Sequence, residues 1–333
     1  MEGNMVSRSE FWKQRRVFVT GCTGILGSWL TLALLDAGAE VVGLIRDRVP
    51  LSNLNLTGAD KRIIAVDGDI VDGALIERVL NEYEIEVVFH LAAQPLVRLA
   101  NRAPVGTFET NVRGTWLLLD ACRVSPTVKR IVVASSDKAY GDQDVLPYTE
   151  DAPLQGRHPY DVSKSCADLI TQAYARTYHL PVAITRCGNI YGGGDLNWDR
   201  IVPGTIRSVL RGESPVIRSD GSPLRDYLFV DDIVDGYLRL AERLADTSLY
   251  GQGFNFGMDD PRSALDMARS IIAISDHPEL QPTVLNQASN EIGKQYLSSA
   301  KAHRVLGWSA QHSLEAGLRR TLDWYRDFLT SHS

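Results

Sequence analysis

Tyr160 and Lys164 stand four positions apart at the start of a segment that reads as a helix, so their side chains share one face. A phenol has a pKa near ~10, too high for a base at neutral pH. A nearby ammonium group, and a cationic nicotinamide, would both favour the phenolate. The pair therefore predicts a tyrosine that takes the proton of a substrate hydroxyl, assisted by a lysine.

Three residues that end a preceding strand are expected to join this pair: Ser136, Asp137 and Lys138. Ligands of an open α/β sheet bind at the carboxyl ends of its strands. Ser136 is expected to hold the same substrate oxygen as Tyr160. Asp137 is a candidate acid if burial keeps it protonated, and Lys138 can act as a base only in its neutral form. The alternative for Asp137 and Lys138 is a solvated ion pair at a strand end.

A glycine-rich turn, GCTGILG from position 21 to 27, lies between the first predicted strand and the first long predicted helix. Glycines in this pattern allow a tight turn, a close approach of a pyrophosphate and close packing of helix on strand. The phosphates would then lie at the positive end of the helix. The turn predicts a bound dinucleotide contacted by Gly21, Thr23, Gly24, Ile25, Leu26 and Gly27.

The adenosine half of this cofactor is expected at the ends of the second and third strands. Asp47 could accept hydrogen bonds from ribose hydroxyls, which favours NAD, whereas Arg46 could hold the 2′-phosphate of NADP. We expect NAD, with NADP as the alternative. Asp69 and Ile70 are expected beside the adenine, although Asp69 could equally be a solvated loop residue. The remaining expected cofactor contacts are Leu91, Ala92, Ala93, Cys187, Tyr160 and Lys164.

Five residues are candidates for binding the substrate: Gln94, Arg98, Asn189, Arg200 and Arg225. The arginines at positions 200 and 225 offer forked donors to phosphate, although a single arginine is more often a surface residue. His90 lies inside an apolar strand and is expected to be a core histidine with satisfied hydrogen bonds. No metal ligand is expected.

The elements that must position these residues alternate between strands and helices. Strands are expected at 16–20, 40–45, 62–66, 87–91, 131–134 and 182–185, and helices at 25–37, 73–83, 104–124 and 163–178. This order predicts an α/β fold with a Rossmann-like, doubly wound parallel sheet. We expect an NAD-binding domain at 13–186, to which 227–258 return. A smaller C-terminal α/β lobe, 187–226 and 259–330, is expected to bind the substrate.

Composition and charge narrow the class of protein. The chain has 333 residues, 44% of them hydrophobic and 23% charged, as in ordinary globular proteins. Its net charge of −6 argues against a nucleic-acid partner, and its apolar runs are too short to span a membrane. Its four cysteines are far apart, without CxxC spacing, as expected for reduced thiols in the cytoplasm.

Together these motifs resemble the extended short-chain dehydrogenase/reductases of the NAD-dependent epimerase/dehydratase family, over residues 11–327. Several segments resemble the CDP-glucose 4,6-dehydratases in particular: Phe11 to Lys13, His90 to Arg98, Ser136 to Lys138, and Gly188-Asn189 followed by GGGD and Asp199-Arg200. The resemblance implies a nucleotide-diphosphate sugar as substrate, a 4-keto-6-deoxy product and a homodimer built on helices 104–124 and 163–178.

Other segments depart from that subfamily. The segment from Arg225 to Asp232 looks like generic epimerases and other dehydratases, and Gly43 to Arg46 looks like the GDP-mannose dehydratases. Lys138 stands where most dTDP-glucose dehydratases have a glutamate. A nucleotide-sugar 4-epimerase is therefore the second candidate. A remoter one is a non-catalytic NAD(P) sensor, which typically lacks the Tyr/Lys pair.

Overall fold

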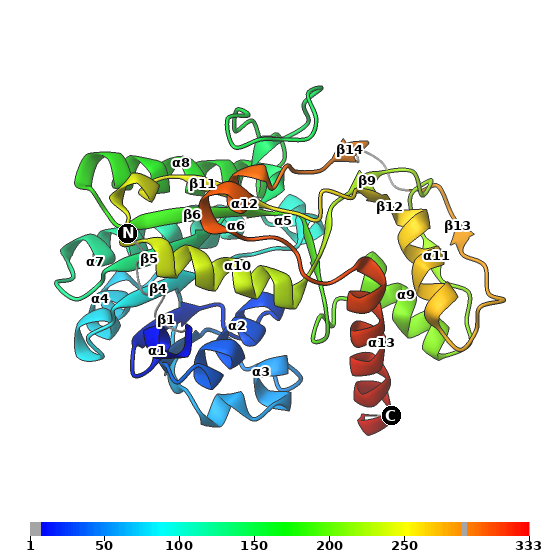
Figure 1. Ribbon diagram of the computed structural model, residues 1–333, viewed down its shortest axis with the longest axis horizontal. Coiled ribbons are helices and arrows are strands. Elements are labelled where there is room, and N and C mark those ends of the chain that lie inside the picture. The colour runs from blue at the N-terminus through cyan, green and yellow to red at the C-terminus, as the bar shows by residue number, and fades with distance from the viewer. Residues whose placement is uncertain (1–7, 288–291, 333) are drawn as a thin grey trace. The chain divides into compact units, whose positions relative to one another are not determined.

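The computed structural model of the protein, shown in Figure 1, describes residues 8–287 and 292–332. Within these residues seven strands form one sheet. Its strands are β1 (Arg16–Thr20), β2 (Glu40–Ile45), β3 (Ile64–Asp67), β4 (Val87–His90), β5 (Arg130–Ala134), β6 (Val182–Cys187) and β11 (Gly253–Phe256). They lie in the order β11-β6-β5-β4-β1-β2-β3, and strands β1 to β6 pair in parallel. The predicted α/β fold with a doubly wound parallel sheet is confirmed.

The strand order reverses between β1 and β4, which are neighbours in the sheet. The segments that follow β1 and β4 run in opposite directions, so the two loops diverge and leave room at the carboxyl edge of the sheet. Such a reversal is where open α/β sheets bind their ligands. The glycine turn follows β1, and Leu91 follows β4.

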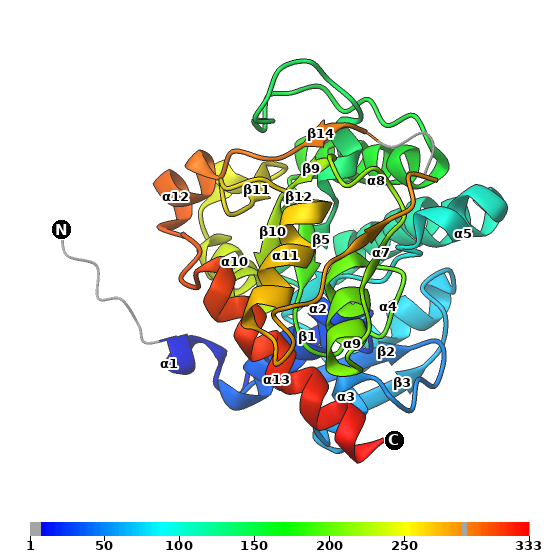
Figure 2. The same ribbon diagram turned by 90° about the vertical axis from the view of Figure 1, so that its right-hand side faces the viewer.

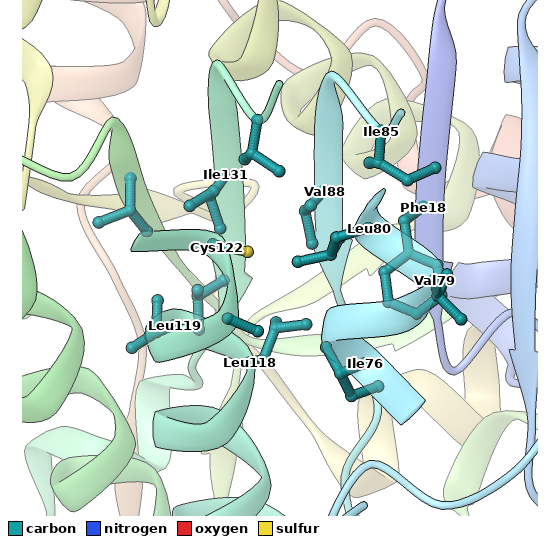
Figure 3. Packing of buried hydrophobic residues seen from close by; sticks show 14 of the residues in the cluster. Phe18, Ile76, Val79, Leu80, Ile85, Val88, Leu118, Leu119, Cys122 and Ile131 are labelled. Atoms are coloured by element: carbon teal, nitrogen blue, oxygen red, sulfur yellow. The ribbon is translucent and has the colours of Figure 1, made fainter. Parts of the chain in front are cut away.

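Helices cover both faces of the sheet. One face packs against α4 (Gly73–Glu82), α7 (Gly114–Val124) and α8 (Pro159–Tyr178). Figure 3 shows this layer, in which Leu80 and Leu118 meet Val88 and Ile131 of the sheet. All four are fully buried. Each such side chain contributes about 1.5–3 kcal/mol by leaving water, so this layer fixes the strands on which the site is built.

The opposite face packs against α1 (Arg8–Trp12), α2 (Ile25–Asp36) and α10 (Val230–Arg243). The fully buried ring of Phe89 in β4 lies 6.0 Å from Trp12 and 6.4 Å from Tyr237, between ring centroids. The shorter elements of this part of the chain are α3 (Asn53–Leu56), η1 (Ala59–Lys61), α5 (Val97–Arg102), α6 (Pro104–Phe108), η2 (Glu109–Arg113), η3 (Asp137–Tyr140) and η4 (Thr247–Leu249).

The chain divides into two compact units. The first contains residues up to Gly141, Pro153–Arg186 and Val234–Phe254, and the second contains Asp142–Ala152, Cys187–Ile233 and the chain from Asn255 onward. Residues 142–152 group with the second unit because Tyr148 exchanges backbone hydrogen bonds with Tyr296 and Ser298.

The second unit is built from short strands and four helices among its described residues. Its helices are α9 (Ile201–Leu210), α11 (Ala264–Ile274), α12 (Ala300–Leu306) and α13 (Leu314–Ser331). Figure 2 shows α9, α11 and α13 side by side, in agreement with their mutual contacts. Its strands are β7 (Asn189–Tyr191), β8 (Val216–Ile217), β9 (Leu224–Arg225), β10 (Tyr227–Phe229), β12 (Arg262–Ser263), β13 (Thr283–Val284) and β14 (Lys294–Gln295).

Most predicted bounds differ from the structure by one or two residues, and three differences are larger. The helix predicted at 104–124 contains a turn of π-helix, η2, between α6 and α7. Helix α8 begins at Pro159, four residues before the predicted start, because a proline is well suited to the first turn of a helix. Strand β11 was not predicted, because Gly251, Gly253 and Gly257 obscure its apolar pattern.

Among residues 8–287 and 292–332, no helix combines the length and apolarity needed to cross a bilayer.

Candidate active site

The glycine turn is tight because, at two of its glycines, a side chain would clash with neighbouring backbone atoms. Gly21 has φ +75°, and a Cβ there would lie 2.8 Å from the backbone nitrogen of Ala92 after β4. A Cβ on Gly27 would lie 2.1 Å from the carbonyl oxygen of Gly21. The turn therefore folds back on itself and against the neighbouring strand end.

Gly24 differs from these two because it faces open space. It is exposed, it has an ordinary φ of −75°, and a Cβ there would meet only the Gly21 oxygen at 3.4 Å. Gly24 is the N-cap of α2, so no side chain of the described residues caps the first N–H groups of the helix. An open helix N-terminus beside a glycine fits the pyrophosphate of a dinucleotide.

Most of the other expected cofactor contacts belong to the first unit, and Leu91 and Ala92 lie beside Gly21 of the turn. Thr23, Ile25 and Leu26 are half-buried along it, as are Leu91, Ala92 and Ala93 after β4. Asp69 is half-buried and accepts a hydrogen bond from the backbone N–H of Val71, 3.2 Å away. Ile70 is buried in the core layer beside Gly114 of α7.

Arg46 and Asp47, the residues that would distinguish NAD from NADP, bind each other. The Arg46 Nε lies 2.7 Å from Asp47 Oδ2, and both side chains are at least half exposed. The Asp47 carboxylate partly neutralises the Arg46 guanidinium, whose positive charge would be needed to bind a 2′-phosphate.

The residues after β5 form a turn whose polar groups are held by one another. Ser136 is the N-cap of η3, and its Oγ accepts a hydrogen bond from the Lys138 backbone N–H at 3.2 Å. The same hydroxyl donates to Asp137 Oδ1 at 3.0 Å. Asp137 is only 5% exposed. Burial favours the protonated form of a carboxyl group, which is the form that an acid catalyst needs, whereas a hydrogen bond donated to the carboxylate favours the charged form.

Helix α8 brings Tyr160 and Lys164 to the same end of the sheet. Both side chains are buried. The Lys164 ammonium donates to the carbonyl oxygen of Ala134, the last residue of β5, at 2.7 Å. Ser165 Oγ donates to the carbonyl oxygen of Ala139 in η3 at 2.8 Å. These two bonds join the start of α8 to β5 and η3, so Ser136, Asp137, Lys138, Tyr160 and Lys164 form one group, hereafter the Tyr160 cluster.

Asp161 is a further ionisable residue beside this cluster, and the sequence analysis did not consider it. It is buried, and burial raises the pKa of its carboxyl group. The positive charges of Lys138 and His158 oppose that rise, whereas the negative charge of Asp137 adds to it. The site thus holds a second carboxyl, whose pKa depends on the charges of Lys138 and Asp137.

His90 is a satisfied core histidine, as predicted. Its Nδ1 lies 2.8 Å from the hydroxyl of Thr20, which already accepts backbone hydrogen bonds from Leu91 and Ala92 and so must donate to the ring. Its Nε2 therefore carries the proton and donates to the hydroxyl of Thr115, 3.0 Å away. Burial, and to a lesser extent the charge of Lys164, lowers the pKa of His90 to about 3.

The π-helical turn η2 supplies a second residue that the sequence analysis missed, Asn111. Its amide nitrogen donates to Ser163 Oγ at 2.9 Å, and Ser163 Oγ donates to the carbonyl oxygen of Tyr160 at 2.6 Å. Its amide oxygen accepts from the backbone N–H of Gln94 at 2.6 Å. Asn111 thus connects the segment after β4 to the first turn of α8. Single π-helical turns often occur at functional sites, but their sequence signal is weak.

The expected substrate-binding residues lie in both units. Gln94 and the exposed Arg98 of α5 belong to the first unit. In the second unit, Asn189 is exposed in β7, and Arg200 precedes α9 with its Nη1 2.9 Å from Asp195 Oδ2. Arg225 is half-buried in β9. Cys187, an expected cofactor contact, also belongs to this unit and is buried at the end of β6.

Known nucleotide-sugar dehydratases and epimerases are similar to this chain in sequence and in fold. The chain is 32% identical to a CDP-glucose 4,6-dehydratase of Salmonella typhimurium, over 96% of this chain and 92% of that protein. A UDP-glucose 4-epimerase structure from Thermotoga maritima, with UDP-glucose, matches with a TM-score of 0.85 and 28% identity, over 94% and 99% of the two chains. A dTDP-glucose 4,6-dehydratase structure from Streptomyces venezuelae, with NAD bound, matches with a TM-score of 0.82 and 30% identity, over 94% and 97%.

A family model described as the NAD dependent epimerase/dehydratase family matches residues 17–257. This match covers the glycine turn, the Tyr160 cluster and most of the sheet. The chain belongs to the NAD-dependent epimerase/dehydratase family, whose members modify nucleotide sugars.

Proposed function

We propose that the protein is a nucleotide-sugar 4,6-dehydratase acting on CDP-glucose or a close analogue. The observation that carries this proposal is the buried Asp137 carboxyl, followed by Lys138, on a turn that is hydrogen-bonded to the Tyr160 helix. Oxidation at C4 of a sugar needs only a base and a cofactor. An additional acid and base are what the removal of water requires.

The first step falls to Tyr160, Lys164 and Ser136. Bound NAD would supply the acceptor for the hydride of C4 and, later, the donor of a hydride to C6. Tyr160, as phenolate, takes the proton of the C4 hydroxyl, and the Lys164 ammonium favours that phenolate. Ser136 can donate a hydrogen bond to the same oxygen.

The second step falls to Asp137 and Lys138. The C4 ketone acidifies the C5 proton, which Lys138 in its neutral form can accept. Asp137 gives its proton to the C6 hydroxyl, which leaves as water as the C5–C6 double bond forms. Return of a hydride to C6 and a proton to C5 gives the 4-keto-6-deoxy sugar. Tyr160 or a water molecule is the alternative base at C5.

NAD is the proposed cofactor rather than NADP, because a carboxylate such as Asp47 can accept from ribose hydroxyls and because Asp47 forms an ion pair with Arg46. We also propose that the first unit binds this cofactor and that the second binds the nucleotide. Asn189, Arg200 and Arg225 would be its contacts, and Arg200 uses Nη1 for its ion pair with Asp195.

A homodimer built on α7 and α8 is the proposed assembly. Large apolar side chains of these helices are exposed, namely Trp116, Val124, Leu169 and Tyr178. Such a set of exposed apolar groups is typical of an interface. Light scattering after size exclusion tests this directly, and Leu169→Glu should yield a monomer.

The four free cysteines support a reducing compartment such as the cytoplasm.

A nucleotide-sugar 4-epimerase is the second candidate, supported by the similarity to the UDP-glucose 4-epimerase and by the segment from Arg225 to Asp232. A non-catalytic sensor has less support, because Tyr160 and Lys164 are both present.

Product mass separates the two enzymes. The purified protein is incubated with NAD and separately with CDP-glucose, dTDP-glucose and UDP-glucose. A dehydratase gives a product lighter than its substrate by one water, whereas an epimerase gives an isomer of unchanged mass. Unchanged mass across the whole panel would overturn the proposal.

A further inference from the structure

A buried ion pair next to the Tyr160 cluster takes no part in the reaction proposed above. Arg186 of β6 binds Asp168 of α8 through two parallel hydrogen bonds, from Nε at 2.8 Å and from Nη2 at 2.9 Å. The remaining guanidinium nitrogen, Nη1, donates to the hydroxyl of Tyr140 at 2.8 Å. Arg186 is 3% exposed, and the other two residues are fully buried.

Such a pair is a costly way to stabilise a fold. Moving two charges out of water costs free energy that their attraction often only balances, so a buried ion pair is weak support for stability. Burial alone would lower the pKa of the Arg186 guanidinium, but the hydrogen-bonded carboxylate of Asp168 outweighs burial and raises it. The guanidinium is therefore a permanent, directional donor, well suited to holding the Tyr140 hydroxyl in one place.

The three residues connect the two parts of the Tyr160 cluster. Asp168 follows Tyr160 by eight positions and Lys164 by four, so all three lie on one face of α8. Tyr140 is the last residue of η3, the single turn that begins at Asp137. The guanidinium carbon also lies 5.0 Å from the centre of the Tyr140 ring. One end of this network thus belongs to the helix of the proposed oxidation step, and the other to the turn of the proposed elimination step.

A second contact joins the same two elements at a different point. Ser165 Oγ donates to the Ala139 carbonyl oxygen at 2.8 Å and accepts from the backbone N–H of Gly156 at 3.1 Å. The bond to Ala139 fixes the position of η3 along the axis of α8. This bond, like that from the Gln155 N–H to the same oxygen at 3.0 Å, holds a backbone atom of the turn, whereas Arg186 holds the side chain of Tyr140.

We propose that Arg186 and Asp168 are positioning residues that act through Tyr140 to hold Asp137 and Lys138 in register with Tyr160 and Lys164. The inference rests on the proposed dehydratase function, because only an elimination needs the two groups of η3. Loss of this register should slow the removal of water and leave oxidation at C4 almost unchanged.

The most direct test is Tyr140→Phe, which removes the hydroxyl that Arg186 holds and keeps the buried ring and the ion pair. Tyr237→Phe is a matched control. Tyr237 is also a buried tyrosine of the first unit, and its hydroxyl is hydrogen-bonded at 2.5 Å to Thr185, the neighbour of Arg186 in β6. Its loss should cost similar stability without affecting η3.

Three quantities are measured for the wild type and both variants, with CDP-glucose as the probe. The first is the single-turnover rise in reduced nicotinamide absorbance, and the second is the rate at which the product lighter by one water forms. The third is backbone hydrogen exchange at residues 137–141. For Tyr140→Phe we expect oxidation within about 2-fold of wild type and elimination slowed about tenfold or more, because a small misplacement of a catalytic group is costly. Reduced nicotinamide should accumulate, and exchange at 137–141 should become faster.

Each other outcome counts against the inference. Equal slowing of both steps in Tyr140→Phe, or behaviour equal to that of Tyr237→Phe, would overturn it while leaving the dehydratase function intact. A wild-type product of unchanged mass on every sugar of the panel would overturn the proposed function and the inference with it.

A second variant tests the same inference if Tyr140→Phe does not fold. Arg186→Lys keeps the positive charge but cannot make two parallel bonds to Asp168 and a third to Tyr140. It should show the same selective loss of elimination, together with a lower melting temperature. A lower melting temperature with both steps unchanged would contradict the positioning role.

Discussion

The glycine turn and the Tyr160 cluster lie at the same edge of one sheet but are built in different ways. The turn is a matter of backbone: a positive φ at Gly21, a close approach at Gly27 and open space at Gly24. The Tyr160 cluster is a matter of side chains, held by hydrogen bonds between segments far apart in the sequence, such as Lys164 to Ala134.

The difference concerns what each region tolerates. A backbone site depends on the absence of side chains, so adding one either breaks the fold or blocks the ligand. A side-chain site depends on individual polar groups, so removing one atom should change a single chemical step and leave the fold in place. Single substitutions in each region separate these two behaviours.

The largest effect is expected for Tyr160→Phe, which removes the phenol that takes the C4 hydroxyl proton. Turnover should fall about 100-fold or more, as for loss of a general base, with melting temperature and NAD affinity close to wild type. Steady-state kinetics and calorimetry measure both. Turnover near the wild-type value would remove Tyr160 from the reaction.

Asp137→Asn should affect only one step of the reaction. The amide has the size of the carboxyl but no acidic proton, so elimination should slow about 100-fold while oxidation at C4 continues. Reduced nicotinamide should accumulate and be visible by its absorbance. If the wild type is an epimerase instead, the substitution should change turnover little.

Gly24→Val tests the backbone site. A side chain there meets little of the protein, so the fold should persist, but it occupies the space before the α2 N-terminus. Loss of the helix contribution of ~2 kcal/mol corresponds to NAD binding weaker by about 30-fold, measured by calorimetry. The contrast is Gly27→Ala, whose Cβ would overlap the Gly21 oxygen and should lower the melting temperature. Unchanged NAD affinity in Gly24→Val would refute the pyrophosphate assignment.

The smallest effect is expected for His90→Gln, as a change in how the free energy of unfolding depends on pH. The pKa of His90 is about 3 in the folded protein and near ~6.5 when unfolded, so the unfolded state binds a proton that the folded state excludes. The free energy of unfolding of the wild type should fall as the pH drops below ~6.5, by about 2 kcal/mol at pH ~5 from this residue alone.

Denaturant unfolding of wild type and His90→Gln at both pH values isolates this contribution. The advantage of the wild type over the variant should shrink by about 2 kcal/mol between neutral and acidic pH. His303→Gln, at an exposed position of α12, should keep the full pH dependence of the wild type. A constant difference between wild type and His90→Gln would mean that His90 is not buried as a neutral ring.

The sequence predicts the backbone site better than the side-chain site, for a physical reason. Glycines between a strand and a helix are a local signal, and so is the spacing of Tyr160 and Lys164 on one helical face. The strand boundaries of β1 and β2 follow from short apolar runs in the same local way, and the structure confirms both.

Residues that act by long-range hydrogen bonds left no comparable signal. Asn111 contacts Ser163 across 52 positions, and it lies in a π-helical turn that an ordinary helical pattern conceals. Arg186 meets Tyr140 across 46 positions and reads in the sequence as one more arginine. Asp161 sits beside Tyr160 in the chain, but only its burial indicates that it matters.

The fate of the C4 hydrogen tests the central claim most directly. CDP-glucose carrying deuterium at C4 is converted by the wild-type protein, and the product is examined by mass spectrometry and nuclear magnetic resonance. A 4,6-dehydratase predicts a product lighter by one water with the deuterium at C6. Deuterium retained at C4 of an isomer with unchanged mass would contradict the account and assign the protein as an epimerase.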